Sequence, residues 1–247
     1  MGMSYGYEDN YPVAKVWMDK AVALDQAFLT AIKWRGIICG EMKDYAGAVA
    51  DFDKAILLDP KNADLYVRRA KMNEGLGKAD DALRDLRFAL DINPGAKRTW
   101  MYLGDVYRVA GNMKSAFDCY DKAVAIDPGY DDALARMANA LNALGRREEA
   151  AAKIDAAISA AKFNKKRFLL QKADLLASWN RLDEAVKCCV QARNVDPRYA
   201  DAWRMEAKYR KASKDLTGFK QAMSTYLELV PTDQKARVEY QSADCME

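Results

Sequence analysis

The chain of 247 residues is 51% hydrophobic and 30% charged, a composition that supports a folded core and excludes a disordered or collagen-like polymer. Its 39 Lys and Arg residues nearly balance 36 Asp and Glu residues, so the net charge of +3 indicates neither a nucleic acid nor an anionic membrane as the partner. Histidine is absent, which removes the commonest general base near neutral pH and the commonest nitrogen ligand of zinc.

The composition also predicts a compartment. No stretch reaches the roughly 18 apolar residues of a membrane-spanning helix. The five cysteines are odd in number and have no CxxC spacing, which is typical of a reducing environment. We therefore expect a cytoplasmic chain with no membrane segment.

The sequence repeats with a period of about 34 residues. Pro60, Pro94 and Pro128 are one period apart, Pro197 follows after two periods and one extra residue, and Pro231 follows one period later. Two alanine ladders keep these steps: Ala14, Ala48, Ala82, Ala116, Ala150 and Ala185, and Ala21, Ala55, Ala89, Ala123, Ala157 and Ala192. A ladder of small residues and a ladder of larger apolar residues do the same: Gly36, Ala70, Gly104, Ala138, Ala173 and Ala207, and Phe52, Leu86, Tyr120, Ile154, Cys189 and Met223. Such self-similarity indicates a repeat architecture.

Each unit is predicted to be a helical hairpin. Apolar residues three and four apart, as in Ala48, Phe52 and Ala55, predict helices. Turn-forming residues separate two such stretches: Gly77, Gly111 and Gly145, with Lys43 and Asn180 in the equivalent places. Proline disfavours helical geometry in the residue before it, so Asp59-Pro60 and its equivalents close the second helix. We expect the small residues to let the two helices approach and the larger ladder to fill the gap between neighbouring units.

This pattern resembles the tetratricopeptide repeat, whose signature runs aromatic, Leu-Gly, Tyr, Ala, aromatic, Ala, Pro. The unit 97–130 matches best, with Trp100, Leu103-Gly104, Tyr107, Ala116, Tyr120, Ala123 and Pro128. The resemblance implies an all-α fold, a right-handed superhelical solenoid of stacked antiparallel helical hairpins that forms a single domain over residues 1–247. Six full units begin near Leu29, Ala63, Lys97, Asp131, Lys166 and Ala200.

Both ends of the array carry a prediction. A truncated unit occupies residues 1–28, with Gly2 and Tyr5 in family slots, and residues 234–245 are predicted to form a C-terminal capping helix. Solenoids normally end in capping units with a polar outer face. We therefore expect that the chain was excised from a longer protein, and that residues near Trp17 support self-association.

Two units depart from the signature. In the fourth, Lys162 replaces the closing proline and one residue is inserted within 162–167. We interpret this basic cluster as a solvated connection at which the superhelix angle changes. In the sixth, Phe219 and Tyr226 occupy both alanine slots. Relaxed packing beside the last helix is the favoured interpretation, and an aromatic docking site is the alternative.

Features that suggest catalysis have simpler structural explanations. Cys188-Cys189 has no histidine base, and Cys189 stands in the larger apolar ladder, which predicts a buried small hydrophobe. The segment 75–78 lacks the Ser or Thr that a phosphate-binding loop requires next, so an interhelical turn is predicted. Glu148-Glu149 lies at a helix start, where acidic groups meet the helix dipole. We predict no enzyme activity, no metal and no cofactor.

In tetratricopeptide repeat proteins the first helices of successive units line a concave groove that usually binds an extended peptide or a partner helix, and the resemblance implies such a groove here. Its 36 slots hold ten basic and seven acidic residues. Asp64, Asp132 and Asp201 sit at helix starts, where we expect N-terminal caps rather than ligand contacts. When the position at the start of each first helix is left out, eight basic and four acidic residues remain in the groove. This excess of positive charge favours a mildly acidic peptide.

The candidate binding residues form a composite patch from three units: Arg68, Lys71, Tyr102, Arg136 and Asn139. Arg suits carboxylates, Tyr offers a rigid amphipathic face, and Asn can pair with an extended backbone. Ordinary solvated side chains that cover the groove floor are the competing interpretation.

Two recognition devices of the family have no clear counterpart in this sequence. Of the residues in the clamp for chaperone tails, only Lys33 matches in kind and Arg98 in charge, so C-terminal chaperone tails are not expected partners. The slots of the asparagine ladder that holds a peptide backbone contain no asparagine: Trp34, Arg68, Tyr102, Arg136, Gln171 and Met205.

We predict a non-enzymatic protein–protein interaction scaffold that binds a protein or peptide in its groove. Single-stranded RNA binding is an alternative, because helical-repeat arrays can read one base per unit. The acidic groove residues and the lack of a repeated pair of base-reading positions argue against nucleic acid. A further alternative is the regulatory or targeting arm of a larger multidomain protein.

Overall fold

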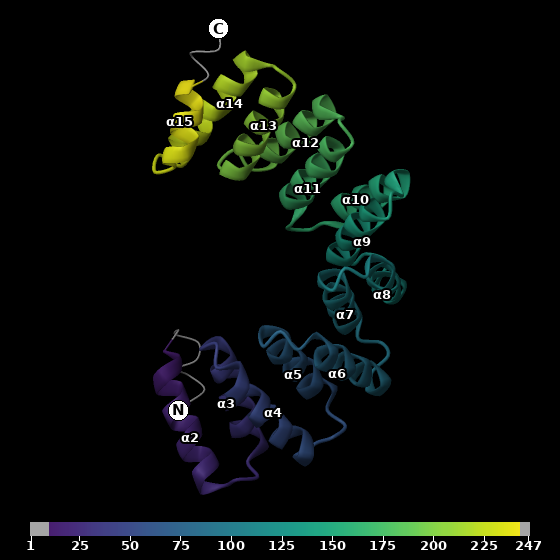
Figure 1. Ribbon diagram of the computed structural model, residues 1–247, viewed down its shortest axis with the longest axis vertical. Coiled ribbons are helices and arrows are strands. Elements are labelled where there is room, and N and C mark those ends of the chain that lie inside the picture. The colour runs from purple at the N-terminus through teal and green to yellow at the C-terminus, as the bar shows by residue number, and fades with distance from the viewer. Residues whose placement is uncertain (1–9, 243–247) are drawn as a thin grey trace. The chain divides into compact units, whose positions relative to one another are not determined.

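The structure is a computed structural model that describes residues 10–242. Within this range the chain forms fourteen α-helices and no strands (Figure 1), which confirms the predicted all-α fold. The helices are α2 (Tyr11–Leu24), α3 (Leu29–Glu41), α4 (Tyr45–Leu58), α5 (Ala63–Gly75), α6 (Ala79–Ile92), α7 (Lys97–Val109), α8 (Met113–Ile126), α9 (Asp131–Ala143), α10 (Arg147–Ala160), α11 (Lys165–Ser178), α12 (Leu182–Val195), α13 (Ala200–Ala212), α14 (Leu216–Leu229) and α15 (Gln234–Ser242).

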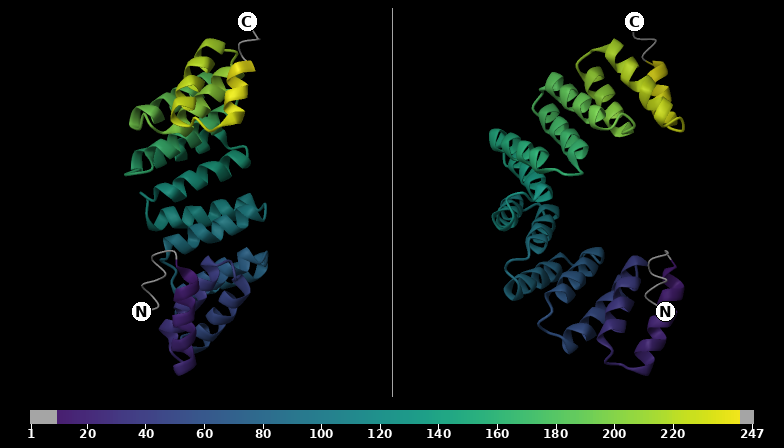
Figure 2. Two further views of the ribbon diagram at one scale, coloured as in Figure 1. Left: turned by 90° about the vertical axis from the view of Figure 1, so that its left-hand side faces the viewer. Right: turned by 180° about the vertical axis from the view of Figure 1, so that it is seen from behind.

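The helices belong to two compact units, residues 1–127 and 128–247, which we call unit 1 and unit 2. Unit 1 contains α2–α8 and unit 2 contains α9–α15. In each unit a first helix and the second helix that follows it form an antiparallel hairpin (Figure 2). The first helices are α3, α5, α7, α9, α11 and α13, and α2 is the second helix of the truncated unit, whose Gly2 and Tyr5 lie outside the described residues. A single domain over the whole chain stays a prediction.

The turn inside each hairpin has one backbone geometry. Residues at the equivalent place in the six turns have positive φ: Lys43 (64°), Gly77 (73°), Gly111 (79°), Gly145 (78°), Asn180 (61°) and Lys214 (65°). After α5, the Gly77 N–H donates to the Glu74 carbonyl at 2.9 Å and the Lys78 N–H donates to the Asn73 carbonyl at 2.8 Å. This pair of bonds is the Schellman motif, which satisfies the last carbonyls of the helix. The turns predicted from the sequence are confirmed, and Lys214 adds the sixth.

The small-residue ladder is buried where the two helices of a hairpin touch. A Cβ at Gly104 would lie 2.5 Å from Cε1 of Tyr120, and a Cβ at Gly36 would lie 3.2 Å from Cζ of Phe52. In these two repeats the larger residue therefore packs against the small residue of its own hairpin. That the larger residues also fill the gap between units stays a prediction. The small residue precedes the turn and the larger residue follows it by a similar number of residues, so the antiparallel pairing of the two helices places them side by side.

Whether a position of this ladder holds glycine or alanine depends on the size of the residue opposite it on the second helix. The register pairs are Gly36 with Phe52, Ala70 with Leu86, Gly104 with Tyr120, Ala138 with Ile154, Ala173 with Cys189, and Ala207 with Met223. Glycine stands opposite the two aromatic rings, and alanine stands opposite the other four side chains. Because protein interiors are close-packed, the missing methyl group makes room for the ring.

The residue inserted in the fourth unit lengthens a helix. α11 has 14 residues, whereas the other first helices have 13. The connection 161–164 before it is as long as the connections 59–62 and 127–130. Lys162 and Phe163 in this connection are exposed, so the connection itself is solvated as interpreted. Lys166 and Arg167 of the basic cluster belong to α11, where they pair with Asp196 and Asp132, and the extra residue extends the start of that helix.

The two aromatic residues of the sixth unit are buried. Phe219 is 0% and Tyr226 is 9% exposed, and both belong to the core cluster that includes Ala236 of α15. The Tyr226 hydroxyl donates to Asp233 Oδ2 at 2.8 Å. Packing beside the last helix is therefore confirmed, and the alternative of an aromatic docking site is wrong because both side chains are buried in this cluster. Residues 243–245 of the predicted capping helix lie outside the described residues.

Candidate functional site

Three of the five candidate binding residues lie on first helices of unit 1, and the structure gives Arg68 a partner within the chain. Arg68 Nε donates to Asp64 Oδ2 at 2.8 Å, and Lys33 Nζ of α3 lies 2.8 Å from the same carboxylate oxygen. Burial alone would raise the pKa of Asp64, but the hydrogen bonds from Arg68 and Lys33 hold that pKa below its usual value. Asp64 therefore links α3 to α5.

The expectation that Asp64, Asp132 and Asp201 cap their helices is wrong. The N-cap residues of α5, α9 and α13 are Asn62, Tyr130 and Tyr199, none with a side-chain cap bond, and the three Asp residues lie in the first helical turn. Each N-cap precedes its Asp by two positions. A carboxylate in the first turn still interacts favourably with the helix dipole.

Lys71, Tyr102 and Glu74 come together across α5 and α7. The Lys71 ammonium lies 5.7 Å from the centroid of the Tyr102 ring, within the range of a cation–π contact. The Tyr102 hydroxyl donates to Glu74 Oε2 at 2.5 Å. Burial and this hydrogen bond raise the pKa of Tyr102, so the phenol stays a donor at neutral pH. The Tyr102 side chain is thus held at its ring by Lys71 and at its hydroxyl by Glu74.

The other two candidates, Arg136 and Asn139, lie on α9 of unit 2. Arg136 is half-buried and Asn139 is exposed. Gln171 Nε2 of α11 donates to Asn139 Oδ1 at 3.1 Å and to the Ala135 carbonyl at 2.7 Å. The sequence analysis did not foresee this contact, although Gln171 stood in the slot of the asparagine ladder.

The first helices of unit 2 are joined by further polar contacts from one repeat to the next. Trp179 Nε1 at the end of α11 donates to Asn142 Oδ1 at 2.6 Å. Between α13 and α11, the Tyr209 hydroxyl donates to Asp174 Oδ1 at 2.5 Å. Polar side chains at these positions therefore hold neighbouring repeats in register.

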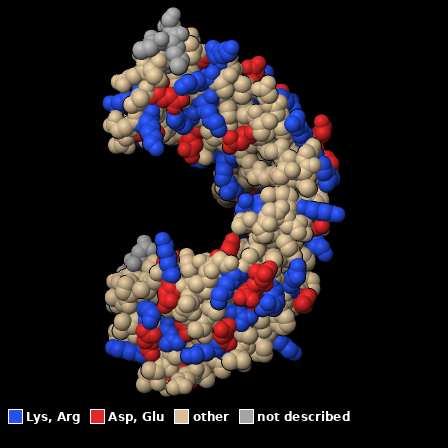
Figure 3. All heavy atoms as spheres, in the orientation of Figure 1, with Lys and Arg blue, Asp and Glu red and all other residues tan. Residues whose placement is uncertain are grey.

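Most of the cations at the groove positions are paired within the chain. Seven of the ten cations form ion pairs with described carboxylates: Lys33, Arg68, Arg108, Arg167, Arg204, Lys208 and Lys211. On the face drawn in Figure 3, Lys and Arg interleave with Asp and Glu over both units. The charge of the first helices is therefore a weak guide to the ligand.

The sequence analysis also missed a recurring ion-pair arrangement, which we call the charge clamp. It joins a first helix to the second helix of its own hairpin and to the second helix of the preceding hairpin. Arg35 of α3 binds Asp51 of α4, with Nη2 2.6 Å from Oδ1, and Asp19 of α2, with Nη1 3.2 Å from Oδ1. Asp51 is 5% exposed. A buried carboxylate of this kind requires its cation.

The next repeat has the same clamp one period later. Arg69 of α5 binds Asp85 of α6 at 2.5 Å and Asp53 of α4 at 2.7 Å. A partial version recurs in unit 2, where Lys172 of α11 lies 2.5 Å from Asp155 of α10. Because these residues keep the period of the repeat, the signal was present in the sequence as a ladder of charges.

The clamp is broken in the repeat 97–130, and a pocket takes its place. Leu103, Cys119 and Arg87 occupy the positions of Arg69, Asp85 and Asp53. The pocket between α6, α7 and α8 has a volume of about 600 Å³, and we call it the α6–α8 pocket. Its lining residues are Arg87, Leu90, Asp91, Pro94, Trp100, Leu103, Tyr107, Ser115, Asp118, Cys119 and Lys122.

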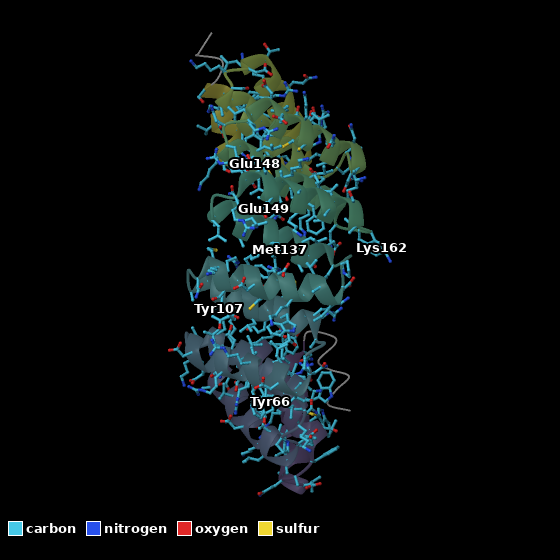
Figure 4. All side chains as sticks on the ribbon, turned by 90° about the vertical axis from the view of Figure 1, so that its right-hand side faces the viewer. Tyr66, Tyr107, Met137, Glu148, Glu149 and Lys162 are labelled. Carbon is cyan, nitrogen blue, oxygen red and sulfur yellow. The ribbon has the colours of Figure 1, made fainter. Side chains whose placement is uncertain are left out.

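Two cations of the α6–α8 pocket rest on aromatic rings. Arg87 donates to the Tyr107 hydroxyl, and its guanidinium lies 5.9 Å from the centroid of that ring; Tyr107 is labelled in Figure 4. Lys122 Nζ lies 4.7 Å from the centroid of Trp100, whose Nε1 donates to the Pro94 carbonyl at 2.8 Å. The pocket therefore has apolar buried residues and two positioned cations.

The cysteines lack the features of a nucleophile. Cys188 is 6% and Cys189 is 0% exposed, and burial raises the pKa of both thiols. The interpretation of Cys189 as a buried small hydrophobe is confirmed. Burial also raises the pKa of Cys119 to about 11. Among residues 10–242, no group of three or more Cys, Asp or Glu side chains is arranged to hold a metal ion.

No helix within the described range is long and apolar enough to cross a membrane.

Comparison with known proteins identifies the repeat. Tetratricopeptide repeat family models match residues 34–62 and 74–131. The chain is 30% identical over 107 residues to small glutamine-rich tetratricopeptide repeat-containing protein 2 of Mycosarcoma maydis, a match that covers 43% of this chain and 30% of that protein. The chain thus spans less than a third of the length of this curated relative.

Solved structures show the same fold. The C-terminal part of a TPR repeat-containing protein from Cytophaga hutchinsonii superposes with a TM-score of 0.73 at 16% identity, covering 95% of this chain and 96% of that chain. YrrB, described as a TPR protein with an unusual peptide-binding site, superposes with a TM-score of 0.55 at 22% identity, covering 77% of this chain and 97% of that chain.

Proposed function

Because the chain belongs to the tetratricopeptide repeat proteins, we propose that it is a non-enzymatic scaffold whose first helices bind an extended peptide or a partner helix. Repeats of this family generally mediate protein–protein interaction. The observation that carries the proposal is the held ring of Tyr102, with Lys71 at 5.7 Å on its face and Glu74 at 2.5 Å on its hydroxyl. A side chain that is already ordered loses little entropy when a ligand binds.

The proposed ligand carries a carboxylate near the Tyr102 ring. Lys71 is exposed and forms no ion pair with a described carboxylate, so its charge is available to a partner. The Arg68 guanidinium is shared with Asp64 and contributes less. In unit 2, Arg136 and Asn139 are the proposed contact residues, and the amide of Asn139 can pair with a peptide backbone. This supports a mildly acidic peptide.

The proposed compartment is the cytoplasm. The four cysteines within the described range are free and buried, as expected of a protein that folds in a reducing environment.

The test is peptide selection followed by binding measurements. Peptides selected from a random displayed library against the full chain are titrated by fluorescence anisotropy. We expect at least about tenfold weaker binding in Lys71→Glu with Tyr102→Ala, or in Arg136→Glu with Asn139→Ala. The matched control is Arg84→Glu, on a side chain that is 75% exposed on α6. Circular dichroism checks that each variant is folded.

Two outcomes would contradict the proposal. Selected peptides that bind all variants with unchanged affinity would show that the first helices do not carry the site. Binding of a single-stranded RNA oligonucleotide that is tighter than any peptide and falls steeply with salt would favour the RNA alternative.

A further inference from the structure

The α6–α8 pocket lies where the preceding repeat has a charge clamp, and the comparison between the two repeats shows what is missing. Around α5, the space between α4 and α6 is about 250 Å³, and its lining includes Arg69, which binds both Asp53 and Asp85. Around α7, the equivalent space is about 600 Å³. That volume falls within the range of roughly 300–1,000 Å³ found for ligand pockets.

The buried lining of the pocket is apolar. Leu90, Leu103 and Cys119 are 5%, 3% and 6% exposed, and the half-buried rings of Trp100 and Tyr107 complete the walls. Such a surface favours a large apolar side chain, because apolar area removed from water is the main favourable contribution to association.

The charges of the pocket favour an acidic ligand. Arg87 occupies the position of Asp53, and Leu103 occupies the position of Arg69. The exchange therefore removes both carboxylates of the clamp and keeps one cation, which now stands on the second helix. Neither Arg87 nor Lys122 forms an ion pair with a described carboxylate, and each is positioned by an aromatic ring. Asp91 and Asp118 also line the pocket, but no hydrogen bond or ion pair with a described residue holds either of them against its wall. The positioned charges are therefore both positive.

We propose that the α6–α8 pocket is a second docking site, which binds an acidic peptide segment by inserting one large apolar side chain between Arg87 and Lys122. The apolar side chain contacts Leu103 and Cys119, and a flanking carboxylate accepts hydrogen bonds from Arg87. Arg can bind a carboxylate with two parallel bonds. This site lies between second helices α6 and α8, and is separate from the Tyr102 contacts of α5 and α7.

The test uses a synthetic peptide with Phe at its centre and two Glu on either side, together with two matched peptides. One matched peptide replaces Phe by Ala, and the other replaces every Glu by Lys. Titration against the full chain, by fluorescence anisotropy, is expected to show saturable binding of the Phe and Glu peptide below about 1 mM. Both matched peptides are expected to bind at least about tenfold more weakly.

The site is located by the indole N–H resonance of Trp100, assigned by its loss in Trp100→Phe. We expect this resonance to shift on titration. A triple variant with Arg87→Asp, Leu103→Arg and Cys119→Asp rebuilds the clamp of the preceding repeat and is expected to lose at least about tenfold in affinity. If the triple variant does not fold, Arg87→Gln tests the charge alone, with the same direction of change. Arg84→Gln, at an exposed side chain of α6 that does not line this pocket, is the control and is expected to bind unchanged.

Several results would overturn the proposal. They are equal or tighter binding of the Lys peptide, unchanged affinity in the folded triple variant or in Arg87→Gln, a Trp100 resonance that does not shift, and no saturable binding at about 1 mM peptide. Because the variant of Lys71 and Tyr102 leaves this pocket intact, and the triple variant leaves the Tyr102 contacts intact, failure here is distinguishable from failure of the proposed function.

Discussion

Replacing Gly104 by Ala adds a methyl group at the contact between α7 and α8. Its Cβ would lie 2.5 Å from Cε1 and 2.7 Å from Cδ1 of Tyr120. The Tyr120 ring is 0% exposed, and its hydroxyl donates to Asp105 Oδ1 at 2.9 Å. The ring therefore has little room to move, and the two helices must separate to accept the methyl group.

The expected cost follows from two opposing contributions. Overpacking of a well-packed core costs about 1–3 kcal/mol, and Ala gains about 1 kcal/mol over Gly in helix propensity. We expect Gly104→Ala to lower the free energy of unfolding by up to about 2 kcal/mol. The matched background is Tyr120→Leu, which recreates the pairing of Ala70 with Leu86 in the preceding repeat.

In the Tyr120→Leu background the sign of the effect is expected to reverse. With the ring removed, only the helix propensity gain is left, so Gly104→Ala should then stabilise by up to about 1 kcal/mol. Urea unfolding of the four proteins, followed by far-UV circular dichroism and by tryptophan fluorescence, gives the double-mutant cycle and tests whether unfolding is two-state. The same effect of Gly104→Ala in both backgrounds would refute the role of the ring.

Three further predictions concern the clamp, the thiols and the turns. Arg69→Met is expected to lower the free energy of unfolding by about 3 kcal/mol, because the Asp85 carboxylate stays buried without its cation; a loss below about 1 kcal/mol in urea unfolding would contradict this. Alkylation of Cys119 by iodoacetamide, followed by mass spectrometry, is expected to be slow near pH 8 and to rise without a plateau toward pH 10, because burial raises the pKa of the thiol to about 11. A plateau near neutral pH would disprove it. Lys214→Gly is expected to stabilise by about 1 kcal/mol, since φ is 65° there, and Gly145→Ala to destabilise by a similar amount; thermal unfolding that ranks these two variants the other way would exclude strain at the turn.

The hairpins could be predicted from the sequence because their turns depend on residue types with special backbone geometry. Gly77 indicates a turn with positive φ, and the Asp59-Pro60 step indicates the end of a helix. Both indications are independent of the residues that pack around them. The start of α5 at Ala63 agrees with the predicted start of the unit, but its cap residue could not be predicted, because Asn62 caps the helix without a side-chain bond. Asp64 was therefore interpreted as a cap and instead binds Lys33 and Arg68.

The candidate site was harder to predict, because it depends on contacts between helices. The repeat period predicts that Lys71 and Tyr102 lie on neighbouring first helices. The hydrogen bond from Tyr102 to Glu74 depends on side-chain rotamers, which the spacing of residues does not determine. The charge clamp was missed for another reason. Arg35 and Arg69 are one period apart, as Asp51 and Asp85 are, but only apolar and small residues had been compared along the ladders.

The charge clamps have a consequence for how such an array can be rearranged. Each clamp uses a carboxylate from the preceding repeat, as Arg69 uses Asp53. If the repeat 97–130 directly followed the repeat 29–62, Leu103 would face Asp53, and that carboxylate would lose its cation. Recombination between units of equal length would thus yield chains with mismatched junctions, so the chemistry of the junctions selects which repeat can follow which, although all share one backbone.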